Sequence, residues 1–129
     1  MHDLINPAID GRLDAIHDAF VHARPFRHCV IDDFLAPAYA HRLLEQFPAF
    51  ERGNHLNEDG RPGRKSTHEG LRDLGADFAA LDDLIQSAPF LALVGRITGI
   101  PGLLYDPMYF GGGTHENRQG QALDLHIDF

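Results

Sequence analysis

The sequence is poor in cysteine and tryptophan, with Cys29 as its single thiol and no tryptophan among 129 residues. One thiol excludes an intrachain disulfide and also a cysteine-rich zinc site. No segment carries the unbroken apolar run of roughly 20 residues that a membrane helix needs. Met1 is followed by His2 and Asp3 rather than by a basic stretch and an apolar core. Nothing therefore indicates a secretory signal, and we expect a cytoplasmic protein without a membrane partner.

Positive charge is also scarce, since 11 Lys and Arg face 19 Asp and Glu and the formal net charge is −8. Phosphate contacts need clustered cationic side chains, and the one basic cluster here is Arg61, Arg64 and Lys65. We therefore expect no nucleic-acid partner. That cluster lies inside the stretch 51–70, which is rich in Gly, His and charged residues and poor in apolar ones. Such a composition predicts a mobile loop, either a solvated surface loop or a lid that covers a substrate.

The length fits one domain, which we place at residues 1–129, and an apolar fraction of 43% is enough for a core. Apolar residues at helical spacing predict helices over 7–23, 37–47, 78–85 and 88–98. Asn6 and Ser87 are the expected N-caps, and Gly99 is the expected left-handed C-terminal residue. Strands are predicted over 26–31, 103–110 and 122–129. Helices with one strand come first and β-structure comes last, which indicates the α+β class.

The last predicted strand carries the residues with metal-binding chemistry. Its apolar positions alternate strictly with polar ones: Leu123, Leu125, Ile127 and Phe129 against Asp124, His126 and Asp128. Side chains at i and i+2 of a strand project to the same side, roughly 6–7 Å apart, so His126 and Asp128 can converge on one ion. An imidazole and a carboxylate are two members of the facial triad of non-haem iron(II) oxygenases. The same alternation also fits an antiparallel strand whose polar face meets water.

The preceding turn offers weaker candidates. His115 and Glu116 lack a second His at the fourth position, so the zinc-protease motif fails. We expect His115 to be a turn residue beside the run Gly111, Gly112 and Gly113, with cavity lining or substitute ligation as the alternative.

The stretch Asp106–Phe129, DPMYFGGGTHENRQGQALDLHIDF, resembles the run that leads into the first metal ligands of prolyl 4-hydroxylase-like iron(II)/2-oxoglutarate-dependent oxygenases. The opening VIDDFLAP from Val30, followed by a helix, is similar to the entry strand and first helix of such domains. One departure is Gly120-Gln121, where the family has a glycine pair.

The resemblance implies a double-stranded β-helix, or jelly-roll barrel, with the N-terminal helices packed against its outside. It also implies iron(II) as cofactor, 2-oxoglutarate as cosubstrate, and hydroxylation of a carbon in a small-molecule or peptidyl substrate. By carry-over, His126 and Asp128 would be iron ligands.

In that family a second metal His and the Arg or Lys that pairs with 2-oxoglutarate lie well downstream of this motif. The chain ends at Phe129, so we expect a truncated reading frame or an excerpt that is inactive alone. Alternatively, another chain or an association of copies supplies the missing half. The rival function is a non-catalytic α+β remnant or interaction module.

We predict that the isolated chain self-associates, because the apolar face of the strand over 122–129 needs a partner surface. Each exposed side chain forfeits roughly 1.5–3 kcal/mol of burial, against a typical domain stability of about 5–15 kcal/mol. Salt screens charge repulsion beyond about 8 Å, so association should increase with ionic strength. Sedimentation at low and high salt tests this. A stable monomer that unfolds cooperatively under both conditions would contradict it.

Overall fold

The computed structural model describes residues 3–56, 62–107 and 113–119. In chain order the elements are η1 (Pro7–Arg12), α1 (Leu13–His22), α2 (Pro37–Glu45), η2 (Phe50–Arg52), β1 (Asn54–Leu56), β2 (Pro62–His68), η3 (Leu71–Leu74), α3 (Ala76–Ile85), α4 (Ala88–Thr98) and β3 (Thr114–Glu116). The mixed α+β class predicted from the sequence is confirmed. The described residues form no jelly-roll barrel, so the double-stranded β-helix stays a prediction.

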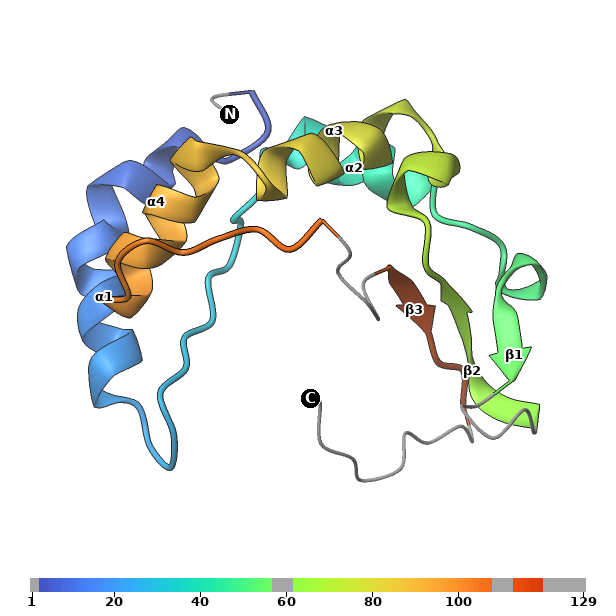
Figure 1. Cartoon of the computed structure of the whole chain (residues 1–129), viewed down its shortest axis with the longest axis horizontal. Coiled ribbons are helices and arrows are strands. Elements are labelled where there is room, and N and C mark those ends of the chain that lie inside the picture. The colour runs from blue at the N-terminus through green and yellow to red at the C-terminus, as the bar shows by residue number, and fades with distance from the viewer. Residues whose placement is uncertain (1–2, 57–61, 108–112, 120–129) are drawn as a thin grey trace.

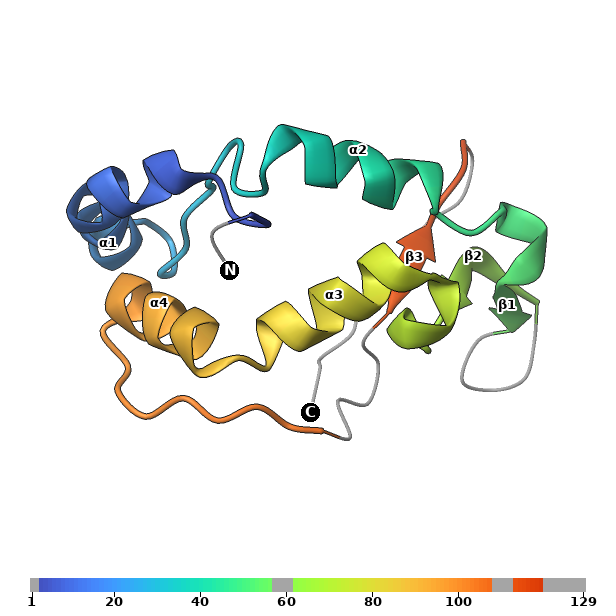
Figure 2. The ribbon, with the colours of Figure 1, turned by 90° about the horizontal axis from the view of Figure 1, so that it is seen from above.

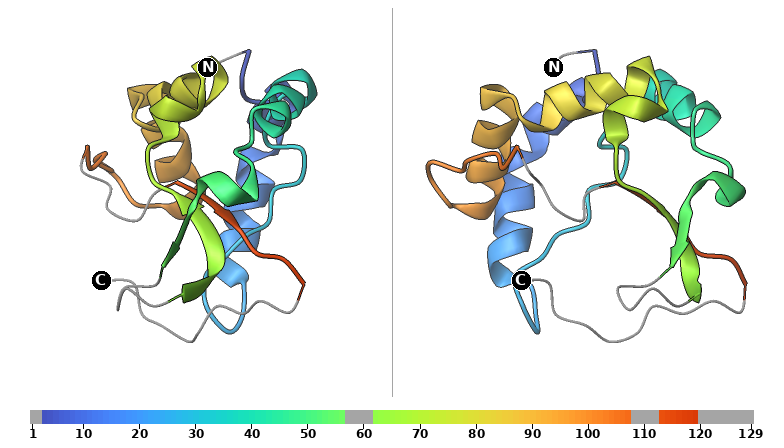
Figure 3. Two further views of the ribbon diagram at one scale, coloured as in Figure 1. Left: turned by 90° about the vertical axis from the view of Figure 1, so that its right-hand side faces the viewer. Right: turned by 45° about the vertical axis from the view of Figure 1, so that its right-hand side comes forward.

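The helices lie in two rows that face each other (Figures 1 and 2). One row holds α1 followed by α2, and the other holds α4 followed by α3, so that α1 packs against α4 and α2 against α3. The three-stranded sheet lies beyond the α2–α3 end of this layer, as Figure 3 shows. The helical layer is therefore continuous, and the sheet is attached at one end of it.

The three predicted capping residues are confirmed, whereas α2 ends two residues earlier and α3 begins two residues earlier than predicted. Asn6 Oδ1 accepts a hydrogen bond from the backbone N–H of Ala8 at 3.0 Å. Ser87 Oγ accepts one from the N–H of Phe90 at 3.3 Å. Gly99 closes α4 with φ at 73°, a left-handed conformation that disfavours side chains with a Cβ. The first turns of the first predicted helix are 3-10 rather than α.

Two groups of buried apolar side chains fill the space between the helix rows. The first group joins η1, α1, α3 and α4: Ile5, Ile9, Leu13, Ile16, Leu84, Leu93 and Ile97. The second joins α2, η3 and α3: Tyr39, Leu43, Leu71 and Phe78. Helix α3 contributes to both groups, and Leu81 packs against each of them. This helix therefore connects the two halves of the core.

The sheet is antiparallel with the order β1-β2-β3. The β2–β3 ladder pairs Ser66 with Glu116, Thr67 with His115 and His68 with Thr114. Strand β1 pairs with β2 with a register irregularity between Asn54 and Leu56. The sheet thus joins residues that are far apart along the chain.

Three predictions over these elements are wrong. Residues 26–31 form no strand, because within the described chain no backbone lies alongside to complete a hydrogen-bonded ladder, and Val30 is 82% exposed. Residues 103–107 form no strand either, and 108–110 lie outside the described ranges. His115 is part of strand β3 rather than of a turn, because it pairs with Thr67.

The stretch 51–70 contains η2 and strands β1 and β2, where composition predicted a loop. Its residues 54–56 and 62–68 belong to the sheet, and the Ser66 hydroxyl donates a hydrogen bond to the carbonyl of Phe50 at 2.6 Å. These contacts outweigh the low intrinsic strand propensity of Gly and charged residues. The mobility of the stretch remains a prediction.

No single helix within the described ranges is long and apolar enough to cross a membrane. By length and composition only, α3 and α4 pass such a test together, as a pair bent by 57°.

We predict that Ile9→Ala lowers the free energy of unfolding by about 2–5 kcal/mol, because Ile9 is 1% exposed and its removal leaves a cavity. Ile100→Ala is the matched control, since Ile100 is 52% exposed and should cost less than about 1 kcal/mol. Urea denaturation of both variants measures the difference. Equal losses would mean that the helix rows are not packed as described.

Candidate functional site

The metal ligands expected from the sequence, His126 and Asp128, lie outside the described residues. Their placement on one side of a strand therefore stays a prediction. Among the described residues, no group of three or more His, Cys, Asp or Glu could hold a metal ion. In donor type, an imidazole and a carboxylate fit iron(II), and the described part of the chain adds no clustered third ligand.

Several of the remaining histidines contact backbone carbonyl oxygens. His17 Nδ1 lies 2.9 Å from the carbonyl of Ile97, which ties α1 to the end of α4. His22 and His28 are exposed and contact carbonyl oxygens on their own segments. His115 is exposed on β3. Hydrogen bonds to backbone carbonyls thus account for His17, His22 and His28.

His68 is different, because its Nδ1 atom is buried without a hydrogen-bond partner in the described structure. It is the last residue of β2 and pairs with the buried Thr114 of β3. Leaving such a nitrogen unsatisfied costs about 1–3 kcal/mol. The strand next to β3 therefore carries a buried imidazole nitrogen that could still form a hydrogen bond.

The end of β3 is fastened to η2 by Arg118. Its Nε donates to Glu116 Oε1 at 3.0 Å, and its Nη1 donates to Glu51 Oε1 at 3.4 Å. The guanidinium carbon lies 4.1 Å from the centre of the Phe50 ring. The hydrogen bond to Glu116 and the charge of both carboxylates raise the pKa of Arg118. The chain that leads from β3 toward the expected metal strand is therefore held at residues 116–118.

The most buried charged group among the described residues is the carboxylate of Asp82 on α3, at 4% exposure. Arg72 Nη1 donates to Asp82 Oδ2 at 2.8 Å and to Asp83 Oδ1 at 2.6 Å. Gln86 Nε2 donates to Asp82 Oδ2 at 3.3 Å. The hydroxyl of Tyr105 donates to Asp82 Oδ1 at 3.1 Å.

These donors come from three parts of the chain, namely η3, the C-cap of α3 and the segment that follows α4. The hydrogen bonds to the two carboxylates raise the pKa of Arg72. Sequence reasoning missed Asp82. The available signal was its place on the apolar side of α3, one turn after Phe78.

A second polar group joins α2 to α3 around Asp77. Arg42 Nε donates to Asp77 Oδ1 at 2.9 Å, and Gln46 Nε2 donates to Asp77 Oδ2 at 2.6 Å. The Tyr39 hydroxyl donates to the backbone carbonyl of Asp77 at 2.8 Å. Burial, together with the charge of Asp77, raises the pKa of Tyr39. This group links α2 to α3, and both carboxylate oxygens of Asp77 already accept hydrogen bonds.

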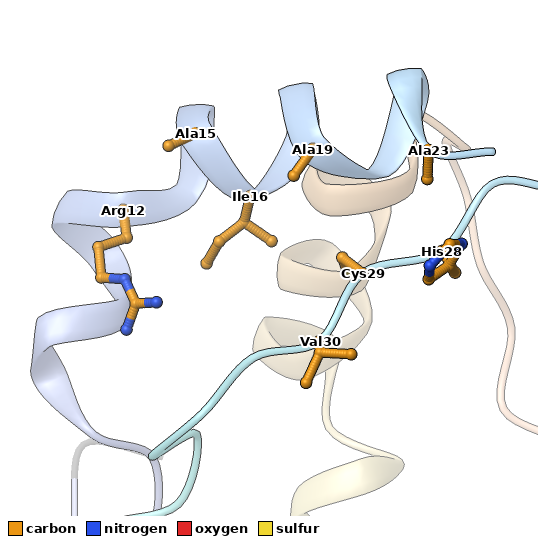
Figure 4. A pocket seen from close by; sticks show the side chains of 8 residues that line it. All are labelled: Arg12, Ala15, Ile16, Ala19, Ala23, His28, Cys29 and Val30. Atoms are coloured by element: carbon orange, nitrogen blue, oxygen red, sulfur yellow. The ribbon is translucent and has the colours of Figure 1, made fainter.

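Two hollows lie on the helical layer. One, of about 380 Å³, lies between α1 and residues 28–30 (Figure 4). Small side chains of α1 form one wall, Cys29 and Val30 the other, and Arg12 and His28 lie at opposite ends. The other, of about 640 Å³, lies between α4 and residues 99–103. The residues that line them include no carboxylate, so neither supplies the donors of an iron site.

Comparisons with protein-family models, with curated proteins and with solved structures found no match for this chain. Its function must therefore be argued from its own residues.

We predict that Asp82→Ala lowers the free energy of unfolding by about 2–3 kcal/mol, because hydrogen bonds to a buried charged group are lost. Asp83→Ala is the matched control, since the Asp83 side chain is 65% exposed and should change stability little. Urea denaturation measures both. If the two variants lost the same stability, Asp82 would not be the buried centre of this cluster.

Proposed function

We propose that this chain carries the first two metal ligands of an iron(II)- and 2-oxoglutarate-dependent oxygenase of the prolyl 4-hydroxylase-like kind. The observation that carries the proposal is the strictly alternating sequence of residues 122–129, in which His126 and Asp128 occupy polar positions two residues apart. A strand is the element that best presents an i, i+2 pair to a single ion. The resemblance of Asp106–Phe129 to the family motif adds specificity that the spacing alone lacks.

The antiparallel ladder of β2 and β3 supports the proposal, because it ends shortly before the expected metal strand begins. A further antiparallel strand would continue this sheet, as the first strands of a barrel do. The described helices pack on one another, and the proposal adds that they would lie against the outside of such a barrel.

In the proposed site, His126 and Asp128 would hold iron(II), and the negative Asp128 would neutralise part of its charge. When bound, the metal with 2-oxoglutarate supplies the oxidation of a carbon by dioxygen. The residues of this chain contribute binding and orientation of the ion. The substrate class, small molecule or peptide, depends on parts of the site outside His126 and Asp128.

We predict that the 129-residue chain binds iron(II) weakly, because two protein ligands hold the ion less well than three. His126→Ala and Asp128→Ala should each abolish this binding in an anaerobic titration. His22→Ala is the matched control, because His22 is an exposed histidine on α1. Equal iron(II) affinity of the wild type and the His126→Ala variant would refute the proposal and favour a non-catalytic interaction module.

The same preparation should release no succinate from 2-oxoglutarate under air with iron(II) and ascorbate. Turnover that is lost in His126→Ala would instead show that residues of this chain complete the site.

A further inference from the structure

The hollow between α1 and residues 28–30 has the size and the lining of a site for a small molecule. Its volume of about 380 Å³ lies in the range of roughly 300–1,000 Å³ that such sites occupy. Ala15, Ala19 and Ala23 form one wall at intervals of four residues, along one side of the helix (Figure 4). Because their side chains are short, they leave a slot in which an aliphatic chain can lie.

The opposite wall is also apolar, and part of it is in contact with water. Cys29 is half-buried and packs against the core of the helices, whereas Val30 is 82% exposed. Within the described chain, no backbone pairs with residues 28–30. An aliphatic ligand in the slot would remove apolar surface of Val30 and of the alanines from water, which is favourable.

Arg12 places a positive charge at one end of the slot. Its side chain is exposed and projects from the same side of the helix as Ile16 (Figure 4). Among the described residues, Arg12 takes part in no ion pair or hydrogen bond. No Asp or Glu belongs to the described lining, although the chain contains 19 such residues. An anionic group at this end therefore meets a cation that no carboxylate of the lining neutralises.

His28, at the other end of the slot, is held by its own segment. Its Nδ1 lies 2.9 Å from the carbonyl oxygen of Phe26. Because a carbonyl oxygen only accepts hydrogen bonds, Nδ1 is the donor in this contact. Arg12 is therefore the group of the described lining whose charge is permanent.

The hollow beside α4 is less suited to an anion. Its lining also includes a cation, Arg96, but Nη2 of Arg96 lies 3.7 Å from Asp14 Oδ1. That carboxylate already neutralises part of the charge of Arg96. The observations therefore favour the hollow at Arg12.

We propose that the hollow between α1 and residues 28–30 is a binding site for a small aliphatic carboxylate. The guanidinium of Arg12 binds the carboxylate group, because it can present two N–H donors to the two oxygens. The aliphatic chain lies between the alanines of α1 and Val30. This site belongs to the helical layer and depends neither on iron(II) nor on the proposed oxygenase function.

Octanoate is the probe, in an isothermal titration of the 129-residue chain below the concentration at which octanoate forms micelles. We predict saturable binding that is roughly threefold to tenfold tighter than that of octan-1-ol, which has the same chain length without the charge. Arg12→Gln should weaken octanoate binding by about the same factor and leave octan-1-ol binding unchanged. Arg27→Gln is the matched control, because Arg27 is an exposed arginine outside the lining.

Cys29 reports whether the ligand lies in the hollow. It is part of the lining and the single thiol of the chain, so its alkylation by neutral iodoacetamide has one origin. Saturating octanoate should slow this alkylation roughly threefold or more, because the ligand restricts access to the thiol. Ala19→Leu, which fills the slot and keeps a high helix propensity, should abolish both binding and protection. Ala40→Leu, at an exposed position of α2, is its control.

Equal affinities for octanoate and octan-1-ol, or an unchanged octanoate affinity in Arg12→Gln, would overturn the proposal, because Arg12 would then not recognise the carboxylate. Octanoate binding without protection of Cys29 would overturn it too, since the ligand would lie elsewhere. If Ala19→Leu does not fold, Arg12→Gln decides the question, because the exposed Arg12 makes no side-chain capping hydrogen bond to α1. A failure of the chain to bind iron(II) would count against the proposed function alone.

Discussion

The buried carboxylate of Asp82 needs hydrogen-bond donors, and this need constrains how the elements around it are arranged. Asp82 is 4% exposed, and a charge withdrawn from water to that extent is stable only with hydrogen-bond donors around it. Those donors are Arg72, Gln86 and Tyr105. Because they come from separate parts of the chain, η3, α3 and the segment after α4 must meet at this point.

The sheet depends on such polar contacts more than the helices do. The helical layer has two apolar clusters, whereas the buried residues among those sheet residues whose burial is described are the polar Ser66 and Thr114. Hydrophobic burial therefore stabilises the helices, and polar contacts hold the described strands. Ser66 contacts the Phe50 carbonyl, and Arg118 contacts Glu51, Glu116 and the Phe50 ring.

This difference between the helices and the sheet fits the proposed iron(II) site. A metal strand that extends the sheet would take its position from β3, and β3 is paired with β2 and linked through Arg118 to Glu51 of η2. The orphaned Nδ1 of His68 lies on the neighbouring strand, where an additional partner would satisfy it. The candidate ligands themselves come from the sequence motif, since no metal cluster exists within the described ranges.

The sequence by itself determined the helices and the class of the fold. Asn6, Ser87 and Gly99 act through hydrogen bonds and dihedral angles of neighbouring residues, so their effect is visible in a short window of sequence. It also provided the motif of His126 and Asp128, whose interpretation depends on the alternation of apolar and polar residues over a few positions. Tertiary structure decided the strands and the burial of Asp82. Strand β2 lies in a stretch with loop composition and forms because Ser66 pairs with the distant Glu116, whereas residues 26–31 have strand composition and no described partner. A strand is completed by backbone from elsewhere in the chain, and no local pattern specifies that partner.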